Sequence, residues 1–361
     1  MLKFNIVLIC IEAYFMLYRE KSEKARKWFF ILTCIQAILL SGLRHIHVGM
    51  DTYNYWNMFE RVKSYSWSYL WVSLKTMVST YEGVEPGFYL SMKIFQIFSK
   101  SFRLYLIVFA CFLNIPLFVQ FYRKSNEGLM SVLIYMTLFF AFVSTTGLRQ
   151  TMALVIMGFI GMDFIIERKL KAFLICVLIS YTFHKSALAF LPFYFIAYKK
   201  LSRPYFYTCL IAVAVLFVFR KPFTEFLTSL GGYEHYGKQY EGAGTYNYSA
   251  ISLTILVMVI WKYKQIIAID KNAVVYINAC IISCILLPIT FIDPSNLRVV
   301  FYYSIMLMFL VPDIYISMER KDRAIMMFAI IALLLAMYFK ESHIYRFMWQ
   351  PGIYNDNISP V

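Results

Sequence analysis

The sequence has little charge and lacks the short motifs that accompany nucleotide or metal chemistry. Only 15% of its 361 residues are Asp, Glu, Lys or Arg and 61% are hydrophobic, whereas soluble domains carry about 25% charged residues. It contains no Gly-rich phosphate loop of the P-loop or Rossmann type, no HExxH, no GxSxG and no DxD pair. These absences argue against nucleotide hydrolysis and against a metal-bound nucleotide-sugar donor in the cytoplasm.

Cysteine chemistry is also missing. All seven cysteines lie inside apolar segments, and no pair has a CxxC or zinc-ligand spacing. Cys280 and Cys284 share a helix face at i, i+4, which two small buried hydrophobic residues explain better than chemistry does. We expect no metal site and no cofactor.

What the chain has in abundance is long apolar runs. They predict an all-α polytopic membrane protein of about 11–13 spans, forming one transmembrane domain over residues 1–361. We expect residues 129–146 to form one of these spans, and 171–198 to form two short ones hinged at 183–187. The net charge of +15 comes from short basic clusters between these runs, which is typical of cytoplasmic loops rather than of nucleic-acid binding. The clusters lie at 19–27, 123–124, 167–171, 199–203 and 319–323.

The basic clusters also predict the orientation. If they face the cytoplasm, the amino terminus and the two longest connections, 44–85 and 220–248, face outward. A crossing by 86–99 would put residues 123–124 outside, so we expect 86–99 to be re-entrant, with a crossing by 65–80 as the alternative. Tyr and Trp are frequent in both external connections. They indicate an aromatic belt at the membrane surface, a sugar-stacking surface, or both.

Ionisable residues concentrate at the outward ends of the predicted spans. Such groups are costly at membrane depth and usually face a water-filled cavity. A single arginine could instead reach the headgroups from a helix end, but the whole set favours a functional cavity. The ionisable residues of the set are Arg44, His45, His47, Asp51, Glu82, Glu85, Arg149, His184, Lys185, Asp293 and Arg298, and the polar amide of Gln150 lies beside Arg149.

These residue types suit a particular chemistry. The planar arginine fork gives phosphate or diphosphate paired donors and stays charged. A histidine can take a proton from a hydroxyl near neutral pH. His184 fits that role better than His45 and His47, which lie on an exposed loop, although a structural role for His184 remains open.

Several ordered segments resemble the EpsG/Wzy-like polysaccharide polymerases of bacterial capsule, exopolysaccharide and O-antigen pathways. The resemblance runs over about residues 40–305, whereas the carboxyl terminus and the loop 220–248 match nothing in that pattern. The segments that carry it are "GLRHIHVGMDTYNYWNMF" (42–59), "EPGFYL" (85–90), "RQTMA" (149–153), "FHKSAL" (183–188) and "LRVVFYY" (297–303).

The resemblance implies an undecaprenyl-diphosphate-linked glycan as donor and a lipid-linked repeat unit as acceptor, at the outer face of the inner (cytoplasmic) membrane. It implies metal-independent transfer of the inverting type, with a flippase and a chain-length regulator as possible partners. Carried over by residue, Arg149 and Arg298 hold the diphosphate, and Arg44 is a third candidate. His184 is the base and Asp51 its competitor. The residues that orient the site are Glu85 and Gln150.

Two other classes stay open. A lipid-linked oligosaccharide flippase or another transporter would have a similar number of spans, but it should place polar residues near the bilayer midplane and show repeated halves. A membrane O-acyltransferase is the other alternative. The clustering of costly residues at one membrane face favours the polymerase.

Overall fold

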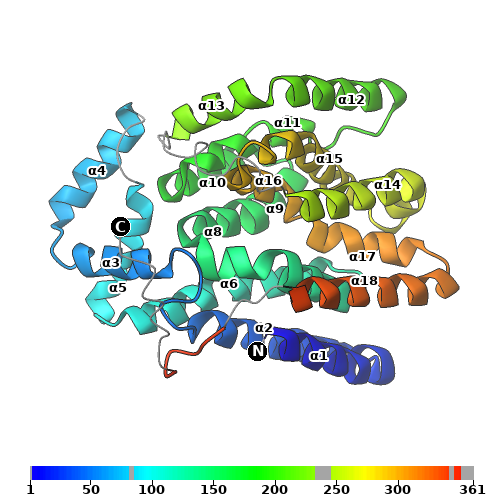
Figure 1. Ribbon diagram of the computed structural model, residues 1–361, viewed down its shortest axis with the longest axis horizontal. Coiled ribbons are helices and arrows are strands. Elements are labelled where there is room, and N and C mark those ends of the chain that lie inside the picture. The colour runs from blue at the N-terminus through cyan, green and yellow to red at the C-terminus, as the bar shows by residue number, and fades with distance from the viewer. Residues whose placement is uncertain (1, 81–84, 232–244, 341–344, 351–361) are drawn as a thin grey trace.

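The structure is a computed structural model that describes residues 2–80, 85–231, 245–340 and 345–350. Within these ranges every regular element is a helix, and the only extended pairing is an isolated antiparallel bridge between Arg44 and Phe347. The prediction of an all-α polytopic membrane protein is confirmed. Figure 1 shows the long helices side by side, with their axes roughly aligned.

The first half of the chain builds one side of this bundle. Its helices are α1 (Leu2–Ala13), η1 (Tyr14–Glu20), α2 (Glu23–Gly42), α3 (Thr52–Val62), α4 (Trp67–Thr80), α5 (Pro86–Phe98), α6 (Phe102–Lys124), α7 (Gly128–Ile134), η2 (Tyr135–Phe139), η3 (Ala141–Thr146), α8 (Leu148–Val155), η4 (Ile156–Gly161) and α9 (Met162–Ile166).

The second half completes the bundle. Its helices are α10 (Leu170–Phe183), η5 (Lys185–Phe190), α11 (Phe193–Ile196), α12 (Arg203–Val218), α13 (Arg220–Gly231), α14 (Tyr246–Ile269), α15 (Ala273–Thr290), η6 (Pro294–Asn296), α16 (Leu297–Ser304), α17 (Leu307–Ser317) and α18 (Arg320–Lys340).

Fewer uninterrupted helices meet the requirements of a membrane span than the sequence predicts. In the described residues five helices are long and apolar enough, and seven if two bent pairs each count as one span. The difference arises because several predicted spans are divided into consecutive short pieces. Residues 129–146, for example, form α7 followed by the π-helical η2 and η3. The break of 171–198 at His184, between α10 and η5, falls within the hinge expected at 183–187.

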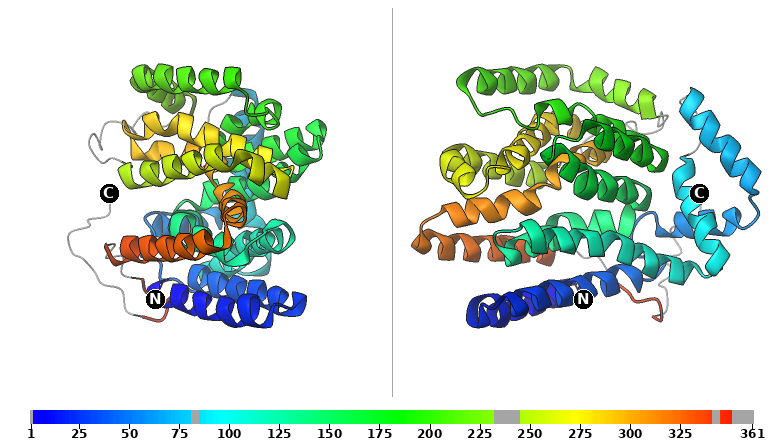
Figure 2. Two further views of the ribbon diagram at one scale, coloured as in Figure 1. Left: turned by 90° about the vertical axis from the view of Figure 1, so that its right-hand side faces the viewer. Right: turned by 180° about the vertical axis from the view of Figure 1, so that it is seen from behind.

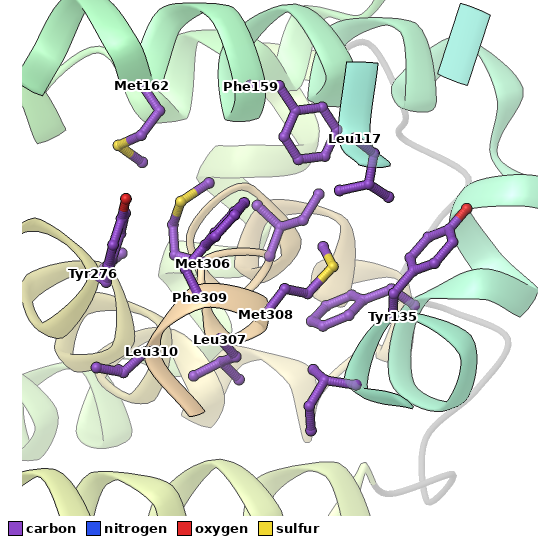
Figure 3. Close-up of a cluster of buried hydrophobic side chains, with 14 of the residues drawn as sticks. Leu117, Tyr135, Phe159, Met162, Tyr276, Met306, Leu307, Met308, Phe309 and Leu310 are labelled. Carbon is purple, nitrogen blue, oxygen red and sulfur yellow. The ribbon is translucent and has the colours of Figure 1, made fainter. Parts of the chain in front are cut away.

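The core of the bundle is filled by large apolar side chains from distant segments. Met306 to Leu310, at the start of α17, contact residues of α6, the η2 segment, η4 and α15, as Figure 3 shows. Tyr276 and Phe309 stack with ring centroids 5.5 Å apart. This packing fixes the position of α16, which immediately precedes α17. It thereby places Arg298 of α16 relative to the helices that carry the other residues of the predicted set.

The predicted external connection 44–85 is mostly helical. α3 packs on α5 through a second apolar cluster that includes Phe59, Phe88 and Met92, and Gln96 of α5 donates to the Phe59 carbonyl at 2.7 Å. α4 lies at the periphery beyond α3 in both Figures 1 and 2. Neither α4 nor α5 meets the length and composition of a span, so the re-entrant path of 86–99 stays a prediction.

Candidate functional site

The Glu85 carboxylate joins three segments that are far apart in the sequence. Its Oε2 atom accepts a hydrogen bond from Arg149 Nη1 at 2.9 Å, and its Oε1 atom accepts one from the Lys185 backbone N–H at 3.0 Å. His184 Nδ1 lies 4.0 Å from the same Oε1 atom. Glu85 is only 3% exposed, so these partners, rather than water, stabilise the charge of its carboxylate.

The sequence Glu-Pro-Gly explains why Glu85 reaches this position. Glu85 occupies the N-cap of α5 without capping it, and Pro86 starts the helix, where its missing N–H costs nothing. A Cβ atom on Gly87 would lie 2.4 Å from Thr182 Oγ1 and 2.8 Å from the Thr182 carbonyl oxygen. Glycine therefore lets the start of α5 lie directly against the end of α10.

His184 sits in the break between α10 and η5. Its backbone is extended, and its ring is held by Ser186, whose N–H lies 3.3 Å and whose Oγ lies 2.6 Å from Nδ1. The Ser186 hydroxyl also contacts the Tyr302 hydroxyl at 3.3 Å. These contacts link the His184 break to α16 and leave the ring 3% exposed.

Arg149 and Gln150 begin α8 directly after a π-helical stretch. Such stretches are uncommon and often mark functional sites. Thr151 holds the junction by donating to the carbonyls of Val143 at 2.5 Å and Gly147 at 3.0 Å. The Gln150 amide donates to the Arg298 carbonyl, so this residue ties α8 to α16.

Arg298 lies in the first turn of α16, after a short turn that begins at Asp293. The Asp293 carboxylate accepts from the Ser295 N–H at 2.8 Å and so caps η6. The half-buried Arg298 interacts electrostatically with Asp51, Tyr55 and His184. Two arginines from different helices thus bear on the same small region.

Asp51 contributes the second acid. It is the N-cap residue of α3, yet its side chain makes no capping bond, and within the described residues its carboxylate accepts no hydrogen bond. Burial raises the pKa of the Asp51 carboxyl above its usual value of 3.8, while Arg298 and Arg149 act in the opposite direction. One turn later, the Tyr55 hydroxyl accepts a hydrogen bond from Arg149.

The structure therefore brings most of the predicted residues together and separates others from them. Glu85, Arg149, Gln150, His184, Arg298 and Asp51 converge where α3, α5, α8, η5 and α16 begin, which we call the site end. Arg44 is near Asp51 in the sequence, but its side chain is buried inside the protein, and only 1% of the residue is exposed. His47 is exposed and stacks on Tyr53. Glu82 lies outside the described residues.

Sequence reasoning missed three contributors to the site. Tyr55 falls one helical turn after Asp51, so the spacing in "DTYNY" could have indicated a shared face. The Lys185 backbone N–H and the Ser186 side chain act through local geometry at the α10 break, which residue types alone do not reveal.

The arrangement is suited to binding an anion between two arginines beside an acid that takes up a proton. Within the described ranges no three His, Cys, Asp or Glu side chains gather as possible metal ligands. Metal-independent chemistry stays a prediction.

Comparison with protein families gives a match over most of the chain. The model of a family described as "EpsG family" matches residues 27–351, which includes every residue of the site. No curated protein and no solved structure matches the chain.

Proposed function

The chain belongs to the EpsG family, which indicates a polysaccharide polymerase in general terms, and we propose the reaction that its site end carries out. It transfers a growing glycan from a polyprenyl diphosphate, such as undecaprenyl diphosphate, onto the terminal sugar of a lipid-linked repeat unit. The reaction takes place at the outer face of the bacterial cytoplasmic membrane, the side predicted by the basic loops.

The observation that carries this proposal is the convergence of Arg149 and Arg298 beside Asp51. A diphosphate leaving group gains negative charge as the glycosidic bond breaks, and fixed guanidinium groups stabilise that charge. Glu85 holds Arg149 at 2.9 Å, so this arginine is oriented before substrate arrives. We call Arg149 and Arg298 the clamp. Arg44 is not part of it, because the Arg44 guanidinium is buried inside the protein.

The proposed step balances without nucleotide or oxidant. The acceptor hydroxyl oxygen attacks the anomeric carbon of the donor glycan, and the bond from that carbon to the phosphate oxygen breaks. The polyprenyl diphosphate leaves with the electron pair. The hydroxyl proton goes to a base, and attack on the face opposite the diphosphate inverts the anomeric centre.

Two residues compete for the role of base, and the contacts favour Asp51. Its carboxylate lies in electrostatic range of both arginines and is not used by α3 as a cap. At His184, the Ser186 N–H donates to Nδ1 at 3.3 Å, and the Ser186 hydroxyl oxygen lies 2.6 Å from the same atom. In that arrangement a neutral ring carries its proton on Nε2 and acts as a hydrogen-bond donor.

The remaining predicted contributors have supporting roles in this proposal. Glu85 and Gln150 orient the two arginine-bearing segments rather than bind substrate. The partners are two lipid-linked oligosaccharides in the membrane, with a flippase that delivers the repeat units and a regulator of chain length. The family match extends through the loop 220–248, part of which lies outside the described residues.

Genetic replacement in the native strain tests the proposal. Arg149→Ala or Arg298→Ala should abolish polymer while single lipid-linked repeat units accumulate at the outer face. Arg61→Ala, at an exposed position on α3, is the matched control and should leave polymer length unchanged. Accumulation of repeat units at the cytoplasmic face instead would reject the polymerase in favour of a flippase.

A further inference from the structure

Arg44 is a buried cation that bonds to the chain around it. Its Nη1 group donates to the Ser41 carbonyl, and its Nε group lies 3.4 Å from Thr52 Oγ1. Within the described residues it forms no ion pair, although burying an uncompensated charge is costly.

A segment some 300 residues later in the sequence covers Arg44. Residues 345–350 run antiparallel to the loop after α2, with the His45 N–H donating to the Arg346 carbonyl at 2.9 Å and the Met348 N–H donating to the Leu43 carbonyl at 2.8 Å. The Tyr345 hydroxyl donates to the Leu40 carbonyl. We call residues 345–350 the clasp.

Beneath the clasp, the Arg44 loop is fastened to the segment that leads into Arg149. Thr52 Oγ1 lies 3.0 Å from the Thr145 carbonyl oxygen and 2.7 Å from that of Val48. Thr52 Oγ1 accepts the bond from the Arg44 Nε–H and directs its own single proton toward these two carbonyls. Ser41 Oγ adds a parallel bond to the Ser144 carbonyl at 2.9 Å.

Gly49 completes the junction between the Arg44 loop and the end of η3. Its φ of +87° favours glycine, and a Cβ atom there would lie 2.0 Å from the Thr145 carbonyl oxygen. The loop therefore lies against the end of η3 with no side chain between them. Asp51 is located between Gly49 and Thr52, so the position of its carboxylate depends on the same junction.

We propose that Arg44 is a positioning residue, and that the clasp holds the Arg44 loop so that Asp51 stays fixed relative to Arg149. The inference rests on the proposed function, because it gives Arg44 a role in that same site without contact with the diphosphate. The clasp is thereby part of the structure that shapes the site end. A displacement of about 1 Å in such a site can lower the rate on the order of a hundredfold.

The Met348→Pro variant is the sharpest test, because it removes the backbone N–H that donates to the Leu43 carbonyl. Met348→Ala keeps this N–H and is the control. Elongation is measured with the full-length protein in proteoliposomes supplied with lipid-linked repeat units, and abundance is checked for each variant. We expect Met348→Pro to lower kcat at least tenfold with KM within about twofold, and Met348→Ala to stay near wild type.

Arg44→Gln should give the same fall in kcat, and the double variant should be no worse than either single one, because both changes release one junction. Arg44→Lys should recover part of the rate. Tyr345→Phe is the milder variant if Met348→Pro fails to accumulate, and it should also lower kcat without raising KM.

Three results would overturn the inference: full activity of Met348→Pro, full activity of Arg44→Gln, or a rise in KM with unchanged kcat in Arg44→Gln. The last would make Arg44 a substrate ligand. None of these rejects the proposed polymerase, which fails separately if Arg149→Ala remains active in the same assay.

Discussion

Arg149 Nη1 donates to Glu85 Oε2 at 2.9 Å, across 64 positions of sequence. The pair joins the start of α5 to the start of α8, and the other Glu85 oxygen holds the break that carries His184. The site is therefore organised by Glu85, an acid that takes no direct part in the proposed reaction.

Neutralising this acid should release Arg149 without removing it. Glu85→Gln keeps the shape but replaces the ion pair between Arg149 and the carboxylate by a weaker hydrogen bond from Arg149 to a neutral amide oxygen. We expect elongation to fall by roughly tenfold to a hundredfold at normal protein abundance. Chain length on gels and elongation rate in membranes measure the effect. Glu60→Gln, which breaks an exposed pair with Lys63, is the control and should be silent.

Lysine should not replace either arginine of the clamp. A lysine keeps the positive charge but loses the planar fork that offers two parallel donors to phosphate. Arg149→Lys and Arg298→Lys are therefore expected to lose most polymer, whereas Arg61→Lys retains it. If Arg149→Lys supports normal chains, Arg149 serves only as a charge near the headgroups and the diphosphate clamp is wrong.

The acid limb of the pH–rate profile should report Asp51. A base works only when ionised, and burial raises the pKa of the Asp51 carboxyl above 3.8. Elongation should thus decrease as the pH falls through that raised pKa. Asp51→Asn should abolish most activity, and any residual rate should lack this limb. A retained limb in Asp51→Asn together with its loss in His184→Gln would make His184 the base.

Asp51 should also cost stability at neutral pH. A carboxyl whose pKa is raised in the folded state binds its proton more tightly there than in the unfolded state, so stability falls as the pH rises through the raised pKa. Asp51→Asn is therefore expected to melt at the same or a higher temperature than wild type at neutral pH in detergent. A clear loss of stability would show that Asp51 is mainly structural.

Two glycines should be intolerant of alanine for steric reasons. At Gly87 the added Cβ meets Thr182, and at Gly49 it meets the Thr145 carbonyl. Each substitution should displace a segment of the site and reduce activity more than abundance. Gly161→Ala is the matched control, since its nearest contact would be an ordinary 3.5 Å. Equal effects of all three changes on activity would refute this account.

The sequence indicated where the site is more reliably than how it is built. Glu85-Pro86-Gly87 and Asp293-Pro294 could be recognised as helix starts, and the cost of burying charge singled out Arg149 and Arg298. The pairing of Glu85 with Arg149 could not be predicted, because nothing local specifies a partner 64 residues away. Arg44 matched the expected motif, but its burial depends on residues 345–350.

The number of spans was the other weak point. Apolar composition identified residues 129–146 as one segment, but not its division into α7 and two π-helical pieces before Gly147. Such breaks depend on packing and on side-chain bonds such as those of Thr151 to the Val143 and Gly147 carbonyls. Hydropathy carries no information on either.

The most direct test is reconstitution of the purified protein in proteoliposomes with one lipid-linked repeat unit as the only substrate. With no nucleotide present and with metal ions chelated, we expect glycans of two or more units and one polyprenyl diphosphate released for each bond formed. Arg149→Ala and Arg298→Ala protein should form none. Movement of repeat units across the bilayer without any new glycosidic bond would contradict the account.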